Sequence, residues 1–367
     1  MTLKMMPELQ IGDLTSAVPI IQGGMGVGVS LSGLAAAVAN EGGIGVISTA
    51  GIGMLEDDFE KNFKEANRRA LQREIKMARE MTKGIIGVNI LVALSDYEDL
   101  LKTSVEAGAN LVFLGAGLPL KVPGIWPRDE WEKITSMIVP IVSSSRAAHI
   151  IFKSWQKNYQ CVPDALVVEG PMAGGHLGFS REQIGDPEYT LEKILPEVIS
   201  VIKPFEQYAG KKIPVIAAGG IYTGSDIYKY FQLGAQGVQM ATRFVATSEC
   251  DASDEFKNAY INCVKEDLVI IDSPVGLPGR AIRNGFLDAI ANDIRVPFKC
   301  PWKCLKTCDL KRSPYCIALA LTNAKNGRLE KGFAFAGANA FRIDKIITVH
   351  ELFYTLIAEY NLSLIHI

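Results

Sequence analysis

Short apolar runs recur along the first 240 residues of the chain, and most of them end in glycine or in a polar side chain. A short continuous run of apolar residues with such boundaries is typical of a strand that is buried on both faces. The pattern therefore predicts eight strands, over residues 18–22, 44–48, 84–91, 110–114, 138–142, 165–169, 213–217 and 237–240.

Longer segments between most of these runs carry apolar residues at helical spacing, which predicts amphipathic helices. The expected helices cover residues 31–40, 56–81, 96–107, 146–159, 191–205 and 224–233. Short strands that alternate with helices fit an α/β (β/α)₈ TIM barrel better than an open sheet. The ligand site of such a barrel lies at the C-terminal ends of its strands, so the residues that follow each strand are expected to meet in one pocket.

The length of 367 residues suits one barrel with an addition. Residues 1–250 are predicted to form the barrel, and residues 251–335 a cysteine-containing helical appendage on the substrate side. Residues 336–367 are expected to pack back on the barrel. This division places the chemistry in the first part and leaves the appendage to be explained.

Composition narrows the class of partner. Charged residues make up 21% of the chain and the formal net charge is −2, so neither a nucleic-acid partner nor a membrane surface is indicated. The first residues are polar and acidic where a secretory signal needs an apolar core, and no uncharged apolar run reaches about 18 residues. A cytoplasmic location and a small-molecule substrate are expected, and a homodimer stays open.

The segment VVEGPMAGGHLGF, residues 167–179, is the strongest candidate for chemistry. An apolar run ends at Glu169 and continues into a glycine-rich loop that holds His176. Glycine allows the backbone to come close to a ligand, and the unperturbed pKa of histidine lies near neutrality. His176 is therefore a candidate proton-transfer group, and the alternative is a histidine of a surface loop without a catalytic role.

Two turns of small residues follow the last two predicted strands. The segment 213–244 contains Gly219-Gly220 after one strand and Ala241-Thr242 after the next. The backbone N–H groups of such turns, aided by a nearby helix start, bind phosphate in barrels with few charged side chains. The phosphate of flavin mononucleotide (FMN) fits this arrangement.

Several motifs together resemble the nitronate monooxygenase family, formerly called 2-nitropropane dioxygenases, and the related flavin-dependent enoyl-acyl-carrier-protein reductases. The matching segments are IIQGGMG at 20–26, GVNI at 87–90, AGGHLG at 173–178, PVIAAGGI at 214–221, GAQGVQMATRF at 234–244, SPVGLPGRAIRN at 273–284 and FAGANAFRIDKIITV at 335–349. The resemblance extends over most of the chain.

This resemblance implies a barrel that binds FMN non-covalently. The flavin phosphate would lie on Gly219, Gly220, Ala241 and Thr242, and the flavin ring near Gly23, Gly24, Met25 and Asn89. His176 matches the family's active-site histidine, and Glu169, Gly174 and Gly175 are expected near the cofactor. Two departures stand out, Ala241 where relatives commonly have glycine, and Ala338-Asn339 where relatives often have Gly-Gln.

Four of the seven cysteines crowd together near the C-terminus. Cys300, Cys304, Cys308 and Cys316 are separated by three, three and seven residues, a spacing that differs from ordinary zinc sites and common ferredoxin motifs. Zinc or an iron–sulfur cluster is one interpretation, and reduced structural or redox-active thiols are the other. Cys161, Cys250 and Cys263 are expected to be ordinary buried thiols.

Three functions compete at this stage. The leading hypothesis is FMN-dependent oxidation of an alkyl nitronate by O₂, with His176 orienting or deprotonating the nitro compound. The alternative is reduction of an enoyl thioester, with NAD(P)H as co-substrate and FMN as hydride carrier. A barrel that binds FMN as a sensor or scaffold without turnover is the third, and the histidine in the glycine loop argues against it.

Overall fold

The computed structural model describes residues 6–300 and 302–365, and its centre is a closed barrel of eight parallel strands. The strands follow the order β10-β11-β3-β4-β5-β6-β7-β8 around the ring. Their bounds are β3 Ile20–Gln22, β4 Ile44–Ser48, β5 Ile85–Leu91, β6 Leu111–Gly115, β7 Met137–Val142, β8 Leu166–Glu169, β10 Val215–Ala218 and β11 Gly237–Met240. All eight predicted strands are present, and the TIM-barrel prediction is confirmed.

Helices surround this ring, as the apolar spacing predicted. The predicted helices are α1 Ser32–Asn40, α2 Phe59–Met81, α3 Tyr97–Glu106, α5 Ser145–Tyr159, α7 Leu191–Ala209 and α8 Gly224–Gln232. Helix α7 continues past its predicted end at residue 205 to Ala209, and its C-cap is Gly210, whose φ of 64° is easily adopted by glycine. Short helical turns lie between these elements, namely η1 Ile52–Leu55, η2 Val122–Ile125, α4 Arg128–Trp131, α6 Arg181–Ile184, η3 Pro187–Tyr189 and α9 Thr242–Val245.

A hairpin that the periodicity did not predict closes the N-terminal end of the barrel. Strands β1 Leu9–Ile11 and β2 Leu14–Ser16 pair antiparallel around Gly12, which has a φ of 55°. Leu9 and Ile11 are each 1% exposed and pack with side chains that fill the barrel interior. The hairpin therefore plugs the end of the barrel opposite to the strand ends that carry the predicted site.

The appendage differs from the expected helical unit because it contains a small sheet. Its elements are α10 Asp254–Ile261, η4 Lys265–Asp267, β12 Leu268–Asp272, β13 Pro278–Ile282, α11 Gly285–Ala291, α12 Ile317–Lys325 and η5 Leu329–Lys331. Strands β12 and β13 pair antiparallel, and β13 also pairs with the short strand β9, Gly175–His176. The predicted loop around His176 is thus partly a strand, held by residues about one hundred positions later.

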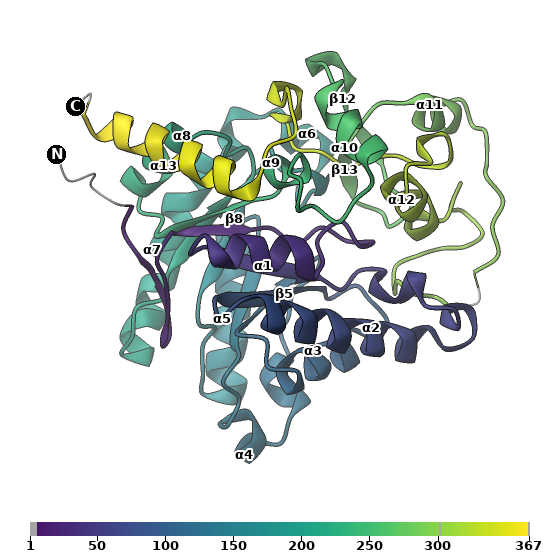
Figure 1. Cartoon of the computed structure of the whole chain (residues 1–367). Helices are drawn as coiled ribbons and strands as arrows, with labels where there is room; N and C mark the ends of the chain where they lie inside the picture. Colours follow the sequence, from purple (N-terminus) through teal and green to yellow (C-terminus); the bar gives the residue numbers. More distant parts are fainter. Residues whose placement is uncertain (1–5, 301, 366–367) are drawn as a thin grey trace.

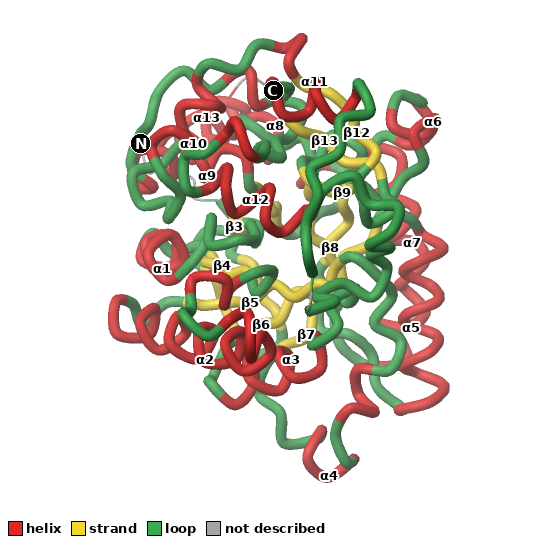
Figure 2. Tube along the Cα trace, turned by 90° about the vertical axis from the view of Figure 1, so that its right-hand side faces the viewer, coloured by secondary structure: helices red, strands yellow, loops and turns green. Residues whose placement is uncertain are grey.

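The C-terminal part returns to the barrel. After η6, Ala340–Arg342, helix α13 covers Val349–Ile365 and packs on α8 and, with fewer contacts, on α1. Figure 1 shows α13 in yellow beside α8, far from α11 and α12. Figure 2 shows the ring of strands from the appendage side, with α12 and long loops in front of it. No helix in the described part of the chain is both long and apolar enough to cross a membrane.

Candidate active site

A cavity of about 720 Å³ lies at the C-terminal ends of the barrel strands. Every residue predicted to bind the cofactor or act on the substrate lines it: Gly23, Gly24, Met25, Asn89, Glu169, Gly174, Gly175, His176, Gly219, Gly220, Ala241 and Thr242. Cavities of about 300–1,000 Å³ are usual for small-molecule sites. The fold therefore gathers residues from all parts of the barrel sequence around one space, as the strand-end rule predicted.

Gly219 and Gly220 follow β10 with φ values of 91° and 89°, a backbone region that favours glycine. A Cβ atom on Gly219 would lie 2.7 Å from the carbonyl oxygen of Gly170, and one on Gly220 would lie 2.7 Å from the Cβ atom of Met172. Within the described residues, the N–H groups of Gly219 and Gly220 donate no backbone hydrogen bond. The turn therefore presents free N–H donors, and a residue with a side chain at either position would block access to them.

The start of helix α8 is less available than the sequence suggested. Asp226 accepts hydrogen bonds from the N–H groups of Tyr222 and Thr223, at 3.0 and 2.8 Å. Glu359 of α13 accepts one from the N–H group of Gly224, at 2.7 Å. Because carboxylates of the chain already occupy these donors, an anion in the cavity must be held mainly by the turns rather than by this helix.

Residues 337–339 fasten the two turns to the loop that carries His176. The N–H group of Gly337 donates to Oγ1 of Thr242 at 3.0 Å, and Nδ2 of Asn339 donates to the carbonyl of Gly220 at 2.6 Å. The N–H group of Ala338 donates to the carbonyl of Met172 at 3.0 Å. Asn339, one of the two departures from the family pattern, thus supports the Gly220 turn through its side chain.

His176 is held by residues that sequence reasoning did not single out. Its Nε2 lies 2.7 Å from Oγ of the buried Ser273, and its ring packs edge-on against Phe335 with the centroids 4.9 Å apart. Burial lowers the pKa of His176 to about 4, so the imidazole is neutral at neutral pH. Nδ1 has no hydrogen-bond partner among the described residues. One ring nitrogen is therefore positioned and the other is free.

Arg280, also missed from the sequence, stabilises the loop before His176. Its guanidinium is 8% exposed and donates to the carbonyls of Pro171 and Ala173, both at 2.6 Å. Burial lowers its pKa to about 10, which still leaves the group charged at neutral pH. Among the described residues, no carboxylate contributes to this shift. The loop is therefore fixed by carbonyl contacts to a buried cation.

Glu169 ends β8 at the wall of the cavity, where burial raises its pKa to about 7. The carboxyl group is therefore only partly ionised at neutral pH. Asn89 is 7% exposed, and its amide contacts the carbonyl of Phe113 at 3.5 Å and Oγ of Ser48 at 3.4 Å. Asn89 also lies directly against Gly24, where a Cβ atom would collide with it. These contacts set the depth of the cavity next to β3 and β5.

The cysteine segment also reaches the cavity. Cys304 lines it, whereas Cys300, Cys308 and Cys316 are not among its lining residues, and all four thiols are free. In residues 6–300 and 302–365, no group of three or more His, Cys, Asp or Glu side chains is arranged to hold a metal ion. Zinc at the four thiols gains no support from this arrangement. Cys250 and Cys263 are buried as expected, whereas Cys161 is only half-buried.

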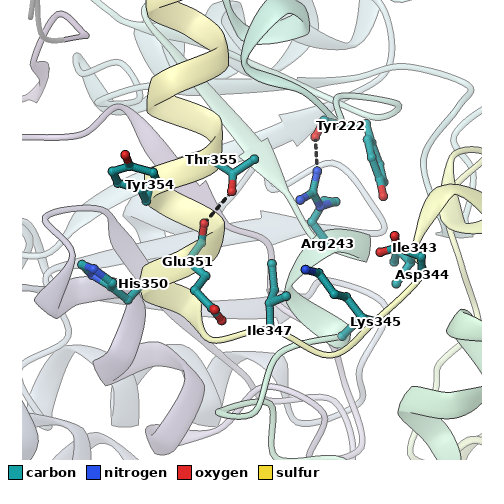
Figure 3. A pocket seen from close by; sticks show the side chains of 11 residues that line it. Tyr222, Arg243, Ile343, Asp344, Lys345, Ile347, His350, Glu351, Tyr354 and Thr355 are labelled. Atoms are coloured by element: carbon teal, nitrogen blue, oxygen red, sulfur yellow. Dashed lines mark hydrogen bonds between the residues drawn. The ribbon is translucent and has the colours of Figure 1, made fainter.

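A second pocket of about 520 Å³ lies beside α13, outside the barrel mouth (Figure 3). Arg243 donates to the carbonyl of Tyr222 at 2.9 Å, and its guanidinium lies 4.3 Å from the centre of the Tyr222 ring. Acidic and basic side chains alternate around this pocket, including Asp344, Lys345 and Glu351. It contains neither the glycine turns nor His176, so it is not the site of the predicted chemistry.

The barrel and its cavity define a TIM-barrel enzyme with a glycine-lined anion cradle at its last two strands. A family model described as "Nitronate monooxygenase" matches residues 8–359, and the chain belongs to this family of oxidoreductases. The family resemblance carried by the motifs is thereby confirmed.

Individual relatives agree with this assignment. A "Probable nitronate monooxygenase" of Staphylococcus aureus (strain Newman) is 29% identical over 300 residues, which cover 74% of this chain and 77% of the relative. Among solved structures, FabK from Thermotoga maritima is 28% identical with a TM-score of 0.73, covering 95% of this chain and 94% of FabK. A nitroalkane oxidase from Streptomyces ansochromogenes, 21% identical with a TM-score of 0.72 and coverage of 95% and 97%, supports the fold alone.

Proposed function

We propose that the protein is an FMN-dependent nitronate monooxygenase that oxidises alkyl nitronates with O₂. The observation that carries this proposal is a neutral histidine, positioned by Ser273, on the wall of the same cavity as the glycine cradle. Membership of the nitronate monooxygenase family supports it independently.

The residues present fit FMN. The turn at Gly219 and Gly220 presents unpaired N–H groups. A side chain on either glycine would occupy the space beside these groups. Gly23 and Gly24 follow β3, which pairs with β11, and they line the same cavity as Asn89 of β5, where the glycines leave room for a flat ring system. The chemistry that FMN supplies when bound is oxidation of the nitronate coupled to reduction of O₂.

His176 handles the proton in this proposal. A neutral imidazole either accepts a proton from a nitroalkane or donates a hydrogen bond to a nitronate oxygen, depending on its tautomer. If Nε2 accepts from the Ser273 hydroxyl, Nδ1 carries the hydrogen and is a donor; if Nε2 donates, Nδ1 is a free base. The direction of the hydrogen bond with Ser273 is therefore linked to the role that the free nitrogen takes.

Glu169 and Arg280 set the charge around the substrate. A carboxyl group with a pKa of about 7 is partly neutral at neutral pH, which lowers its repulsion of an anionic nitronate and of a phosphate. The buried charge of Arg280, behind the loop of residues 171–173, favours an anion in the cavity. Both groups therefore make the site suitable for an anionic substrate.

Reduction of an enoyl thioester with NAD(P)H is the second candidate. It is favoured by the similarity to FabK and by the apolar side of the cavity, which Phe59, Leu94 and Leu321 line. The "enoyl reductase domain of MlnA" shares the fold at 14% identity. A storage or sensor role is disfavoured because the chain belongs to an enzyme family. Cytoplasmic location, a homodimer and the three-part division of the chain remain predictions.

One pair of assays separates the two enzymatic functions. The released cofactor is identified by mass spectrometry, and O₂ uptake is measured with alkyl nitronates. NAD(P)H oxidation is measured without oxygen in the presence of a crotonyl thioester. We expect FMN, rapid O₂ uptake and slow NAD(P)H oxidation. Rapid anaerobic NAD(P)H oxidation would favour the second candidate, and release of FAD would contradict the cofactor assignment.

A further inference from the structure

The connection between α11 and α12 is long and irregular. Residues 292–316, apart from 301, contain neither helix nor strand. Figure 1 shows this connection running from α11 to the start of α2 and returning to α12. Structureless connections of this length are uncommon in compact domains unless they have a function. Residues 302–307, which we call the strap, are the part of the connection that reaches the active-site cavity.

The strap is fastened to the loop between β5 and α3. Leu305 forms an antiparallel bridge with Leu94, and the N–H group of Ser95 donates to the carbonyl of Cys304 at 3.0 Å. The N–H group of Lys306 donates to a carbonyl of the same loop at 2.9 Å. Leu305 also packs against the apolar core of the appendage. The strap therefore has a fixed position although it contains no regular secondary structure.

Trp302 attaches the strap to the start of α2. Its Nε1 donates to the carbonyl of Glu60 at 3.1 Å, and its ring packs against Phe59 with the centroids 5.1 Å apart. Helix α12 contacts the neighbouring turn η1, because Oγ1 of Thr322 lies 3.3 Å from Sδ of Met54. The strap and α12 therefore enclose this end of the cavity together with η1 and the start of α2.

The wall that these segments form is apolar. It consists of Met54, Phe59, Leu94, Trp302, Leu305 and Leu321, which all line the cavity. Asp96 also lines it, but this residue is 2% exposed and accepts a hydrogen bond from Asn67 at 2.8 Å, so it adds little charge to the cavity surface. Among the described residues, no lysine or arginine lines the cavity. This end of the cavity is therefore suited to a group that gains by leaving water.

We propose that this end of the cavity binds the apolar chain of the substrate, and that Trp302 and Leu305 determine which chains are accepted. The inference rests on the proposed function, in which the nitronate group lies at His176, on the wall of the same cavity. The substrates are then nitronates with a long unbranched alkyl chain in preference to short ones. Each methylene group buried against the wall is expected to raise the affinity about two- to fourfold.

Saturated carboxylates test this subsite without turnover, because a carboxylate, like a nitronate, is a planar anion with two oxygen atoms. Binding of butyrate, hexanoate and octanoate to the FMN-loaded protein is measured by calorimetry. The kcat/KM for O₂ uptake is measured with primary alkyl nitronates of the same chain lengths. We expect Kd to fall about two- to fourfold for each methylene group, and kcat/KM to rise with chain length. A carboxylate affinity that does not change with chain length would overturn the subsite.

The subsite and the proposed function fail in different ways. Carboxylate affinity that rises with chain length, without oxidation of any nitronate, would contradict the proposed function and support the subsite. Rapid O₂ uptake with an equal kcat/KM for short and long nitronates, and an equal affinity for all three carboxylates, would contradict the subsite and support the proposed function.

Variants of the strap test which residues set the preference. Trp302→Ala and Leu305→Ala are compared with Leu310→Ala, which changes a 36% exposed residue of the same connection that does not line the cavity. Each strap variant is expected to lower the octanoate affinity by about tenfold and to weaken the dependence on chain length, whereas Leu310→Ala should change neither. Circular dichroism and flavin content confirm folding, and the wild-type series keeps the test decisive where one variant fails to fold. Wild-type dependence on chain length in both strap variants would overturn the assignment of Trp302 and Leu305.

Discussion

His176 depends on residues that lie far from it in the sequence. Ser273 contacts its Nε2, Phe335 packs against its ring, and Gly279 of β13 is its pairing partner. The chemistry of one side chain is therefore set by three segments of the appendage and C-terminal region. Separate substitutions of His176 and of Ser273 therefore distinguish the role of the imidazole from that of the residue that contacts it.

Replacing His176 with alanine is expected to lower turnover of nitronates by about 10² to 10⁴, the usual contribution of a positioned proton-transfer group. FMN binding is expected to persist, because the cradle at Gly219 and Gly220 is not touched. Steady-state kinetics and flavin content after gel filtration measure the two effects. Full activity on every nitronate tried would return His176 to a structural role.

Ser273→Ala is expected to lower turnover less than His176→Ala, because the imidazole stays in place and loses only the hydrogen bond at its Nε2. The pH profile of kcat/KM is the readout that a purely structural role would leave unchanged. Ser273→Thr, which keeps the hydroxyl, is the matched control and should restore the profile. An unchanged profile in Ser273→Ala would show that Ser273 does not position the ring.

Glu169 and His176 give the apoprotein opposite pH dependences. The pKa of Glu169 rises from 4.5 to about 7 on folding, so the folded state holds its proton longer and the free energy of unfolding falls as pH rises from 4.5 to 7. The pKa of His176 falls from 6.5 to about 4, so the free energy of unfolding falls as pH drops from 6.5 to 4. The pH ranges of the Glu169 and His176 contributions overlap, so a variant of one residue is needed to separate them.

Glu169→Gln removes the titrating carboxyl group and with it the Glu169 contribution to the pH dependence of stability. Relative to wild type, the variant is expected to gain roughly 1–3 kcal/mol in the free energy of unfolding between pH 5 and pH 8. Urea unfolding of the apoproteins at both pH values measures it. Glu60→Gln, on the exposed face of α2, is the control and should show no such gain. An equal response of the two variants would mean that Glu169 is not desolvated in the fold.

At the level of elements, the turn after β10 leaves little room for an added side chain. Gly220→Ala places a Cβ atom 2.7 Å from that of Met172 at a φ of 89°. We expect FMN affinity to fall at least tenfold, together with a modest loss of stability of about 1 kcal/mol. Titration of the apoprotein with FMN measures the affinity.

Gly210→Ala is the matched control for this change. Gly210 ends α7 with a φ of 64°, and a Cβ atom there would meet nothing within 4 Å. The control carries the same type of backbone strain away from the cavity, so it should lose stability and keep its FMN affinity. If both variants lost affinity equally, the effect would be due to general destabilisation and not to the cradle.

The elements predicted from sequence are those whose periodicity is local. The barrel strands and the helices between them were found because apolar runs and helical spacing are visible in short windows. Strand β9 was not, because its two residues pair with Gly279 and Arg280, a partner that no local pattern shows. The hairpin at Leu9–Ser16 has alternating residues around Gly12-Asp13, a pattern typical of a hairpin, but its strands are too short to stand out by periodicity.

Site residues could be predicted where a glycine or a histidine follows a strand. They could not be predicted where the supporting residue is of a common type without a recognisable pattern. Ser273 and Arg280 lie in a segment whose match to the family gave no role to either, and a serine in a turn has no distinguishing pattern. Asn339 departs from the family pattern, yet its side chain supports Gly220. Such roles arise only from contacts between distant segments.

For the whole molecule, the contact between α8 and α13 connects two distant parts of the chain, because α8 follows the Gly219-Gly220 turn and α13 is the C-terminal helix. Gly224 begins α8, and a Cβ atom there would collide with the backbone of Leu356 and Tyr360 in α13. Gly224→Ala is therefore expected to lower the free energy of unfolding by about 1–3 kcal/mol through overpacking, despite the better helix propensity of alanine. Thermal and urea unfolding measure the change.

Gly285→Ala controls for helix propensity. Gly285 begins α11 as Gly224 begins α8, and a Cβ atom there would meet nothing within 4 Å. This variant should keep or slightly raise the free energy of unfolding. A stable Gly224→Ala variant would show that α13 can move away from α8 without cost.

The closing seam of the barrel has a consequence for the order of events during synthesis. Strand β3 pairs with β11, Ile20 opposite Val238, and the N–H group of Gly23 donates to the carbonyl of Met240 at 2.8 Å. Contacts between such distant positions form late, because the chain between them must first be ordered. A nascent chain on the ribosome cannot complete the seam until the residues of β11 have emerged. The cavity walls on either side of the seam are therefore brought together only when two thirds of the protein has been made, and cofactor capture has to follow translation of the barrel.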